Sequence, residues 1–146
     1  MRLPQFAAVL LATAILATGC SAPAGSVSVT AGPTAAAAPA VGSSLGPAEF
    51  ASAAKRADTV LLDVRTPAEF ATGHLPGAMN LDVESAEFAT LVGQLDTAKN
   101  YAVYCRSGNR SKVAMTALQQ LGITSAFDLS GGIGAWQSAG GEIVTD

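Results

Sequence analysis

Short apolar runs alternate with helix-like segments along this chain from Gly46 onward. Apolar and β-branched residues predict strands at 59–64, 78–81, 101–104 and 126–129. Helical signals fall between them, at 47–54, 66–73, 85–95, 112–121 and 130–136. Parallel strands need long connections, which are usually helices. The alternation therefore predicts one α/β domain with a parallel sheet covered by helices on both faces.

Two local patterns support the predicted helices. The T-P-A-E sequence at 66–69 has the form of a capping box, with Thr66 as the N-cap and Glu69 three residues later. The helix at 85–95 has apolar residues at the spacing of one helix face, namely Phe88, Leu91, Val92 and Leu95.

One loop concentrates reactive and basic residues, the C-R-S-G-N-R-S sequence at 105–111. It follows a predicted strand and precedes a predicted helix, so Cys105 lies over a helix N-terminus. Free N–H groups and the helix dipole favour an anion there, and Arg106 and Arg110 add positive charge. The loop is predicted to hold a thiolate nucleophile in a cradle for small anions, at the carboxyl end of a central strand where open sheets place their sites.

The beginning of the chain is almost free of charge, since Arg2 is the only charged side chain before Glu49. Residues 1–19 have a short basic start, an apolar core and small residues before Cys20, as in a secretory signal. The L-A-T-G-C sequence at 16–20 resembles a bacterial lipobox, which implies cleavage before Cys20 and its lipidation. An ordinary cleaved signal and an uncleaved anchor stay open as alternatives.

Residues 20–45 contain no charged or aromatic side chain and are dominated by Ala, Gly, Pro and Ser. Such a composition cannot bury a core, so it predicts a disordered tether ahead of a folded domain at 46–146. The domain is expected to be exported and held at the cell membrane by the lipid on Cys20, facing the periplasm or the cell exterior.

The chain has two cysteines, so Cys105 has no partner in the chain if Cys20 carries a lipid. A lone thiol in an exported protein is either reactive or buried and inert, and the loop setting favours reactivity. The net charge of −3 gives no reason to expect a nucleic-acid partner. The sequence contains no cofactor motif and no metal-ligand cluster, and a small tethered domain is expected to be a monomer.

Three segments together resemble the small single-domain type of the rhodanese family. They are L-L-D-V-R-T-P-A-E-F-A-T-G-H-L-P-G-A-M-N-L at 61–81, Y-C-R-S-G-N-R-S at 104–111 and L-S-G-G-I-G-A-W-Q-S-A-G at 129–140. The resemblance implies a central, mostly parallel five-stranded sheet with helices on both faces. It also implies a sulfurtransferase in which Cys105 takes sulfane sulfur from a small anion such as thiosulfate and passes it to cyanide or a thiol. A phosphatase branch that resembles this family has one more residue between the cysteine and Arg110, so the shorter loop is typical of sulfur transfer.

The resemblance also implies roles for the loop residues. Cys105 is the nucleophile that forms a persulfide. Backbone N–H groups of the next six residues would hold its outer sulfur, namely Arg106, Ser107, Gly108, Asn109, Arg110 and Ser111. Gly108 lets the loop turn, the two arginines attract and orient the anionic donor, and Ser111 donates a hydrogen bond or caps the following helix.

Other polar residues are given supporting roles. Asp63 and Arg65 are expected to support loops through an ion pair, with a place in the site as the alternative. His74 is expected to be structural, because an ionised thiol needs no general base, and Trp136 is expected to pack the last helix onto the sheet.

Two further functions stay open beside a thiosulfate sulfurtransferase. The domain could be a persulfide carrier for a protein partner. It could also be a non-catalytic binding module, although rhodanese-like modules of that kind usually lack the loop cysteine.

Overall fold

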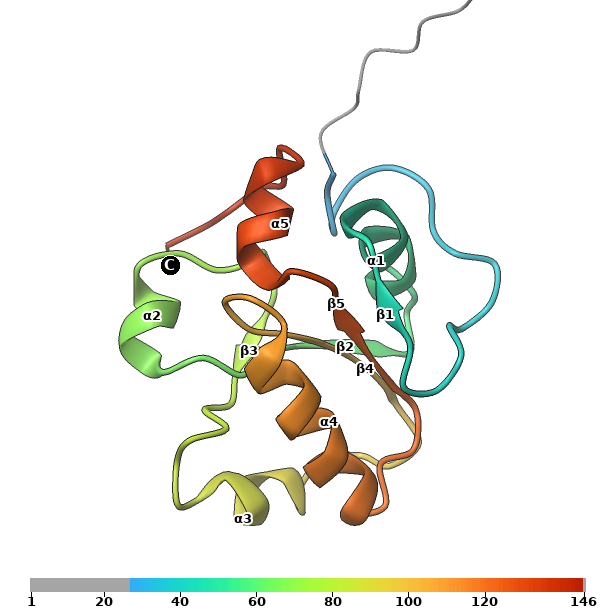
Figure 1. The fold of residues 1–146 in the computed structure, drawn as a ribbon. Helices are drawn as coiled ribbons and strands as arrows, with labels where there is room; N and C mark the ends of the chain where they lie inside the picture. The colour runs from blue at the N-terminus through green and yellow to red at the C-terminus, as the bar shows by residue number, and fades with distance from the viewer. Residues whose placement is uncertain (1–26, 146) are drawn as a thin grey trace, which may run out of the picture.

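A five-stranded sheet with all strands parallel forms the centre of the computed structural model, which describes residues 27–145. The sheet order is β1-β5-β4-β2-β3 (Figure 1). The strands are β1 (Ser44–Leu45), β2 (Thr59–Asp63), β3 (Met79–Asn80), β4 (Asn100–Tyr104) and β5 (Ala126–Leu129). The helices are α1 (Pro47–Ala54), α2 (Pro67–Ala71), α3 (Phe88–Val92), α4 (Asn109–Gln120) and α5 (Gly132–Ser138).

Each face of the sheet packs against its own hydrophobic core. Side chains alternate between the two faces of a strand, so Tyr101 and Val103 of β4 join the core beneath α3 and α4. Ala102 and Tyr104 join the opposite core, beneath α1 and α5. Cys105 continues the alternation and belongs to the α4 side. The predicted α/β fold, with helices on both faces of a parallel sheet, is confirmed.

The local helix signals hold in most places. The capping box is present, since Thr66 Oγ1 accepts a hydrogen bond from the Glu69 N–H at 3.3 Å while the Glu69 carboxylate accepts one from the Thr66 N–H. Trp136 is fully buried and its Nε1 donates to the carbonyl of Glu142 at 2.9 Å, which confirms its packing role. The helix predicted at 85–95 is shorter in the structure, where α3 spans Phe88–Val92. Only Phe88 and Val92 of α3 reach the core, and Leu91 is 41% exposed.

The prediction of a disordered tether does not hold for residues 27–45. β1 lies within this range and pairs with β5, which supplies the fifth strand. Ahead of β1, the Ala35 N–H donates to the Ser52 carbonyl at 2.8 Å. Lys55 Nζ donates to the carbonyls of Ser28 and Ala31, each at 2.8 Å. The segment lacks charge and apolar period, but backbone hydrogen bonds and the side chain of Lys55, the C-cap of α1, hold it against the domain.

The predicted signal peptide and the lipidation site Cys20 lie outside the described residues. Within residues 27–145, no helix is long and apolar enough to cross a membrane.

Candidate active site

Cys105 lies immediately after β4, at the carboxyl edge of the sheet and next to the start of α5. Figure 1 shows the loop between β4 and α4 beside α5. Its side chain is buried, and the Gly108 N–H donates a hydrogen bond to Sγ at 3.1 Å. Gly108 has a positive φ of 96° and is the N-cap of α4, so it makes the turn that brings this N–H back to the sulfur. The structure therefore places the predicted nucleophile inside a turn that donates to it.

The N-terminal turn of α5 fixes the orientation of the cysteine loop. The N–H of Ile133 donates to the carbonyl of Cys105 at 2.9 Å, and the N–H of Gly134 donates to the carbonyl of Arg106 at 3.3 Å. In a planar trans peptide the C=O and the following N–H point in opposite directions. The N–H groups of Arg106 and Ser107 are thus directed away from α5, and neither donates to a backbone carbonyl within residues 27–145. These two N–H groups are available to a ligand.

The glycine pair at the start of α5 makes this close approach feasible. Gly131 and Gly132 have φ values of 74° and 59°. A Cβ at Gly132 would overlap the carbonyl oxygen of Cys105 and the backbone of Arg106. The S-G-G-I-G motif therefore holds the cysteine loop by backbone contact, a role that the sequence analysis did not assign to it.

Ser111 lies beneath the sulfur and is fully buried. Its Oγ is 3.9 Å from Cys105 Sγ, 3.0 Å from the carbonyl of Gly108 and 2.8 Å from Oδ2 of Asp128. Asp128 is a buried residue of β5 that the sequence analysis missed. A carboxylate within the otherwise apolar A-F-D-L strand was the signal that could have identified it.

Arg110 is already engaged by carboxylates. Its Nη1 and Nη2 donate to the two carboxylate oxygens of Glu69, each at 2.7 Å, and Nη1 also reaches Glu84 at 3.1 Å. Hydrogen bonds from Arg110 lower the pKa of Glu69 to about 2, and hydrogen bonding to Glu69 raises the pKa of Arg110. The charge predicted to orient an anion is therefore compensated, and Arg110 instead ties the start of α4 to α2 and its capping box.

Arg106 and Ser107 are exposed and line a pocket of about 500 Å³ between the loop, α2 and α5. Arg65, Thr72 and Gln137 add further polar side chains to its wall, as does Glu69, whose carboxylate is paired with Arg110. Asn109 is exposed at the first position of α4. Arg106 forms no ion pair within the described part of the chain, so it offers the pocket an uncompensated positive charge.

Asp63 and Arg65 form a buried ion pair at the carboxyl end of β2. Arg65 Nε donates to Asp63 Oδ1 at 2.9 Å, and its Nη2 donates to the Gly73 carbonyl at 2.8 Å. The guanidinium also lies over the ring of Tyr104, 5.7 Å from its centroid. The pair holds the segment after α2 against the sheet, as expected for a supporting ion pair. Arg65 also lines the pocket, which agrees with the alternative of a place in the site.

His74 is a buried residue of the segment that follows α2. Its ring stacks on Phe70 with centroids 3.7 Å apart, and its backbone forms an antiparallel bridge with Val144. This packing agrees with a structural role. Among residues 27–145, no group of three or more His, Cys, Asp or Glu side chains is arranged to hold a metal ion.

Gly132→Ala should displace the cysteine loop. The added Cβ would overlap the Cys105 carbonyl, and a left-handed conformation costs a residue with Cβ about 1–2 kcal/mol before any overlap. We expect a lower free energy of unfolding in urea and an altered alkylation rate of Cys105. Gly134→Ala is the matched control, because its Cβ would meet the Arg106 oxygen at an ordinary 3.6 Å. Equal behaviour of the two variants would contradict the role given to Gly132.

The Arg110–Glu69 pair should make stability depend on pH. The pKa of Glu69 is about 2 in the fold, below its ordinary value of 4.5. The pair therefore stabilises the fold fully above pH 4.5, and this contribution is lost as the pH falls toward 2. Glu69→Gln should lower the melting temperature near neutral pH and flatten its decline across that window.

Glu49→Gln on α1 is the control for this experiment, because Glu49 forms no ion pair within the described residues. It should leave the acid decline as in the unmodified protein. A decline that is as steep in Glu69→Gln as in the unmodified protein would show that the pair contributes nothing to it.

Known proteins resemble this chain over the residues that form the sheet and the cysteine loop. The rhodanese-like domain family matches residues 46–139. A sulfurtransferase from Allochromatium vinosum is 38% identical over 87 residues, which cover 60% of this chain and 79% of that protein. The thiosulfate sulfurtransferase GlpE of Pseudomonas syringae pv. syringae is 33% identical over 92 residues, which cover 63% of this chain and 85% of GlpE.

A solved structure shows the same arrangement. The crystal structure of a rhodanese-related protein from Thermoplasma volcanium superposes with a TM-score of 0.64 at 33% identity, covering 71% of this chain and 99% of that one. The family match spans β2 to β5, the cysteine loop and α5. The chain therefore belongs to the rhodanese-like domain family.

Proposed function

We propose that the protein is a thiosulfate sulfurtransferase that works through a persulfide on Cys105. The observation that carries this proposal is the cysteine loop itself. Cys105 Sγ accepts a hydrogen bond from Gly108, and α5 directs the N–H groups of Arg106 and Ser107 away from itself, without backbone acceptors in the described chain. Several fixed N–H donors around one sulfur suit a polarisable anion that must be held and then released.

The chemistry has two balanced steps. The Cys105 thiolate attacks the outer sulfur of thiosulfate, a new S–S bond forms, and the bond between the two thiosulfate sulfurs breaks. Sulfite leaves with the electron pair of that bond. The acceptor, cyanide or a thiolate, then attacks the outer sulfur of the persulfide, and the Cys105 thiolate is the leaving group.

Charge around the site supports an anionic donor. Arg106 lines the pocket beside the loop without a carboxylate partner in the described chain, whereas Arg110 is committed to Glu69 and Glu84. We therefore assign donor attraction and stabilisation of the leaving sulfite to Arg106. Arg110 holds the loop in position.

A persulfide carrier for a larger thiol or a protein partner is the second candidate. The pocket of about 500 Å³ beside the loop is lined by residues of α2, the loop and α5. This pocket is larger than a small anion requires. In that case thiosulfate would load Cys105 slowly, and the partner thiol would unload it faster than cyanide does.

Thiocyanate formation from thiosulfate and cyanide tests the proposal. Cys105→Ser should reduce it to the uncatalysed rate. Arg106→Ala should keep the persulfide but raise KM for thiosulfate about tenfold, because a charge-assisted hydrogen bond contributes about 1.5 kcal/mol or more. Lys99→Ala is the control, because this basic residue precedes the amino end of β4, whereas the cysteine loop follows its carboxyl end. Activity retained in Cys105→Ser would overturn the assignment, and an unchanged KM in Arg106→Ala would remove Arg106 from the donor site.

We also propose that the chain is exported and anchored by a lipid on Cys20, facing the periplasm or the cell exterior. The L-A-T-G-C sequence at 16–20 and the apolar stretch ahead of it support this. Radiolabelled palmitate fed to expressing cells should label the protein, and Cys20→Ala should abolish the label. Labelling that persists in Cys20→Ala would contradict the anchor.

A further inference from the structure

Asp128 is a buried carboxyl group that the chemistry proposed so far does not use. Two acidic side chains are buried within residues 27–145, Asp63 and Asp128. Asp63 is paired with Arg65, whereas no lysine or arginine of the described chain forms an ion pair with Asp128. Burial of a charged carboxylate without a cation is unfavourable. The side-chain partner of Asp128 in the described chain is the hydroxyl of Ser111.

A single hydroxyl group connects Asp128 to the sulfur. Ser111 Oγ lies 2.8 Å from Asp128 Oδ2 and 3.9 Å from Cys105 Sγ. A hydroxyl has one proton to donate and lone pairs that accept. The Gly108 carbonyl, 3.0 Å from Ser111 Oγ, is the other acceptor for this proton. When Ser111 donates to Asp128 and accepts from the thiol of Cys105, one hydrogen-bonded path joins the two acidic groups.

We propose that Asp128 is a positioning residue that holds the proton of Cys105 when the thiolate forms. The S–H bond of Cys105 breaks and its proton passes to Ser111 Oγ, while the hydroxyl proton of Ser111 passes to Asp128 Oδ2. The negative charge moves from a carboxylate that forms no ion pair in the described chain to a sulfur that accepts the Gly108 N–H at 3.1 Å. The net charge of the site does not change. This inference rests on the proposed function, because it supplies the thiolate that attacks the sulfur donor.

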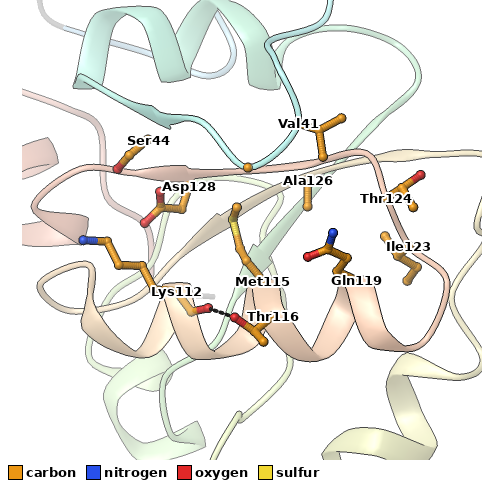
Figure 2. Close-up of a pocket in the computed structure, with 11 residues that line it drawn as sticks. Val41, Ser44, Lys112, Met115, Thr116, Gln119, Ile123, Thr124, Ala126 and Asp128 are labelled. Atoms are coloured by element: carbon orange, nitrogen blue, oxygen red, sulfur yellow. Dashed lines mark hydrogen bonds between the residues drawn. The ribbon is translucent and has the colours of Figure 1, made fainter.

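Asp128 is 1% exposed and lies at the wall of a second pocket. Asp128 lines a pocket of about 290 Å³ between α4 and the β1–β5 edge. Figure 2 shows it on the strand side of that pocket, across from Lys112 and Met115 of α4. This pocket shares no lining residue with the one beside Arg106. The two pockets therefore lie against different residues of the site.

Few charged groups face Asp128 from the elements packed around it. α4 contributes Lys112, which lines the same pocket. The residues aligned with Asp128 in the neighbouring strands are Ser44 of β1 and Val103 of β4, and neither is charged. Asp128 and Cys105 are thus the two acidic groups that can share one proton through Ser111.

The pH profile of Cys105 alkylation by iodoacetamide tests this inference on the full-length protein. Two groups that share a proton titrate in two steps. The alkylation rate should rise first to a plateau, at a fixed fraction of its maximum, and rise again at higher pH. Asp128→Asn keeps an acceptor for Ser111 but cannot take a proton, so it should lose the lower step and show one step only. Asp96→Asn, which removes an exposed carboxylate ahead of β4, should retain both steps.

Two results would overturn the inference. One is a single step in the unmodified protein, a result that does not depend on whether Asp128→Asn folds. The other is a lower step that persists in Asp128→Asn. Alkylation does not involve a sulfur donor, so two steps without thiocyanate formation would refute the sulfurtransferase proposal alone. Thiocyanate formation with a single step would refute the role of Asp128 alone.

Discussion

The hydrogen bonds from α5 to the carbonyls of Cys105 and Arg106 are the contacts on which the site depends. Because a peptide group is planar, a hydrogen bond that fixes the direction of a carbonyl also fixes the direction of the N–H that follows it. The N–H groups of Arg106 and Ser107 are thereby directed away from α5, and neither pairs with a backbone carbonyl of the described chain. Glycine at position 132 is a condition for this geometry, because a side chain there would occupy the space of the Cys105 carbonyl.

Charge in the site is distributed more unevenly than a loop with two arginines suggests. Arg110 is compensated by Glu69 and Glu84, so it fixes the start of α4 to α2. Arg65 is compensated by Asp63, and Arg106 stays free of an ion pair in the described chain. The front of the site therefore offers one uncommitted cation for an incoming anion. On the α4 side, the carboxyl group of Asp128 forms no ion pair within residues 27–145.

Much of this arrangement could be predicted from the sequence, because it depends on local patterns. The alternation of apolar runs and helix signals gave the parallel sheet, and the strand–loop–helix order placed Cys105. The partners of Arg110 could not be predicted, because Glu69 is 41 positions away in sequence and local reasoning had already assigned it to a capping box. β1 was missed for a different reason. A two-residue strand in an Ala- and Gly-rich segment is held by backbone pairing with β5, which leaves no mark in side-chain pattern.

The central claim is that Cys105 carries the sulfur in transit. The most direct test is the mass of the peptide that contains Cys105, measured after the full-length protein is incubated with thiosulfate and again after cyanide is added. The structure and the family to which the chain belongs predict a gain of one sulfur atom on that peptide, which cyanide then removes as thiocyanate. A peptide of unchanged mass after thiosulfate, or an added sulfur that cyanide does not remove, would contradict the account.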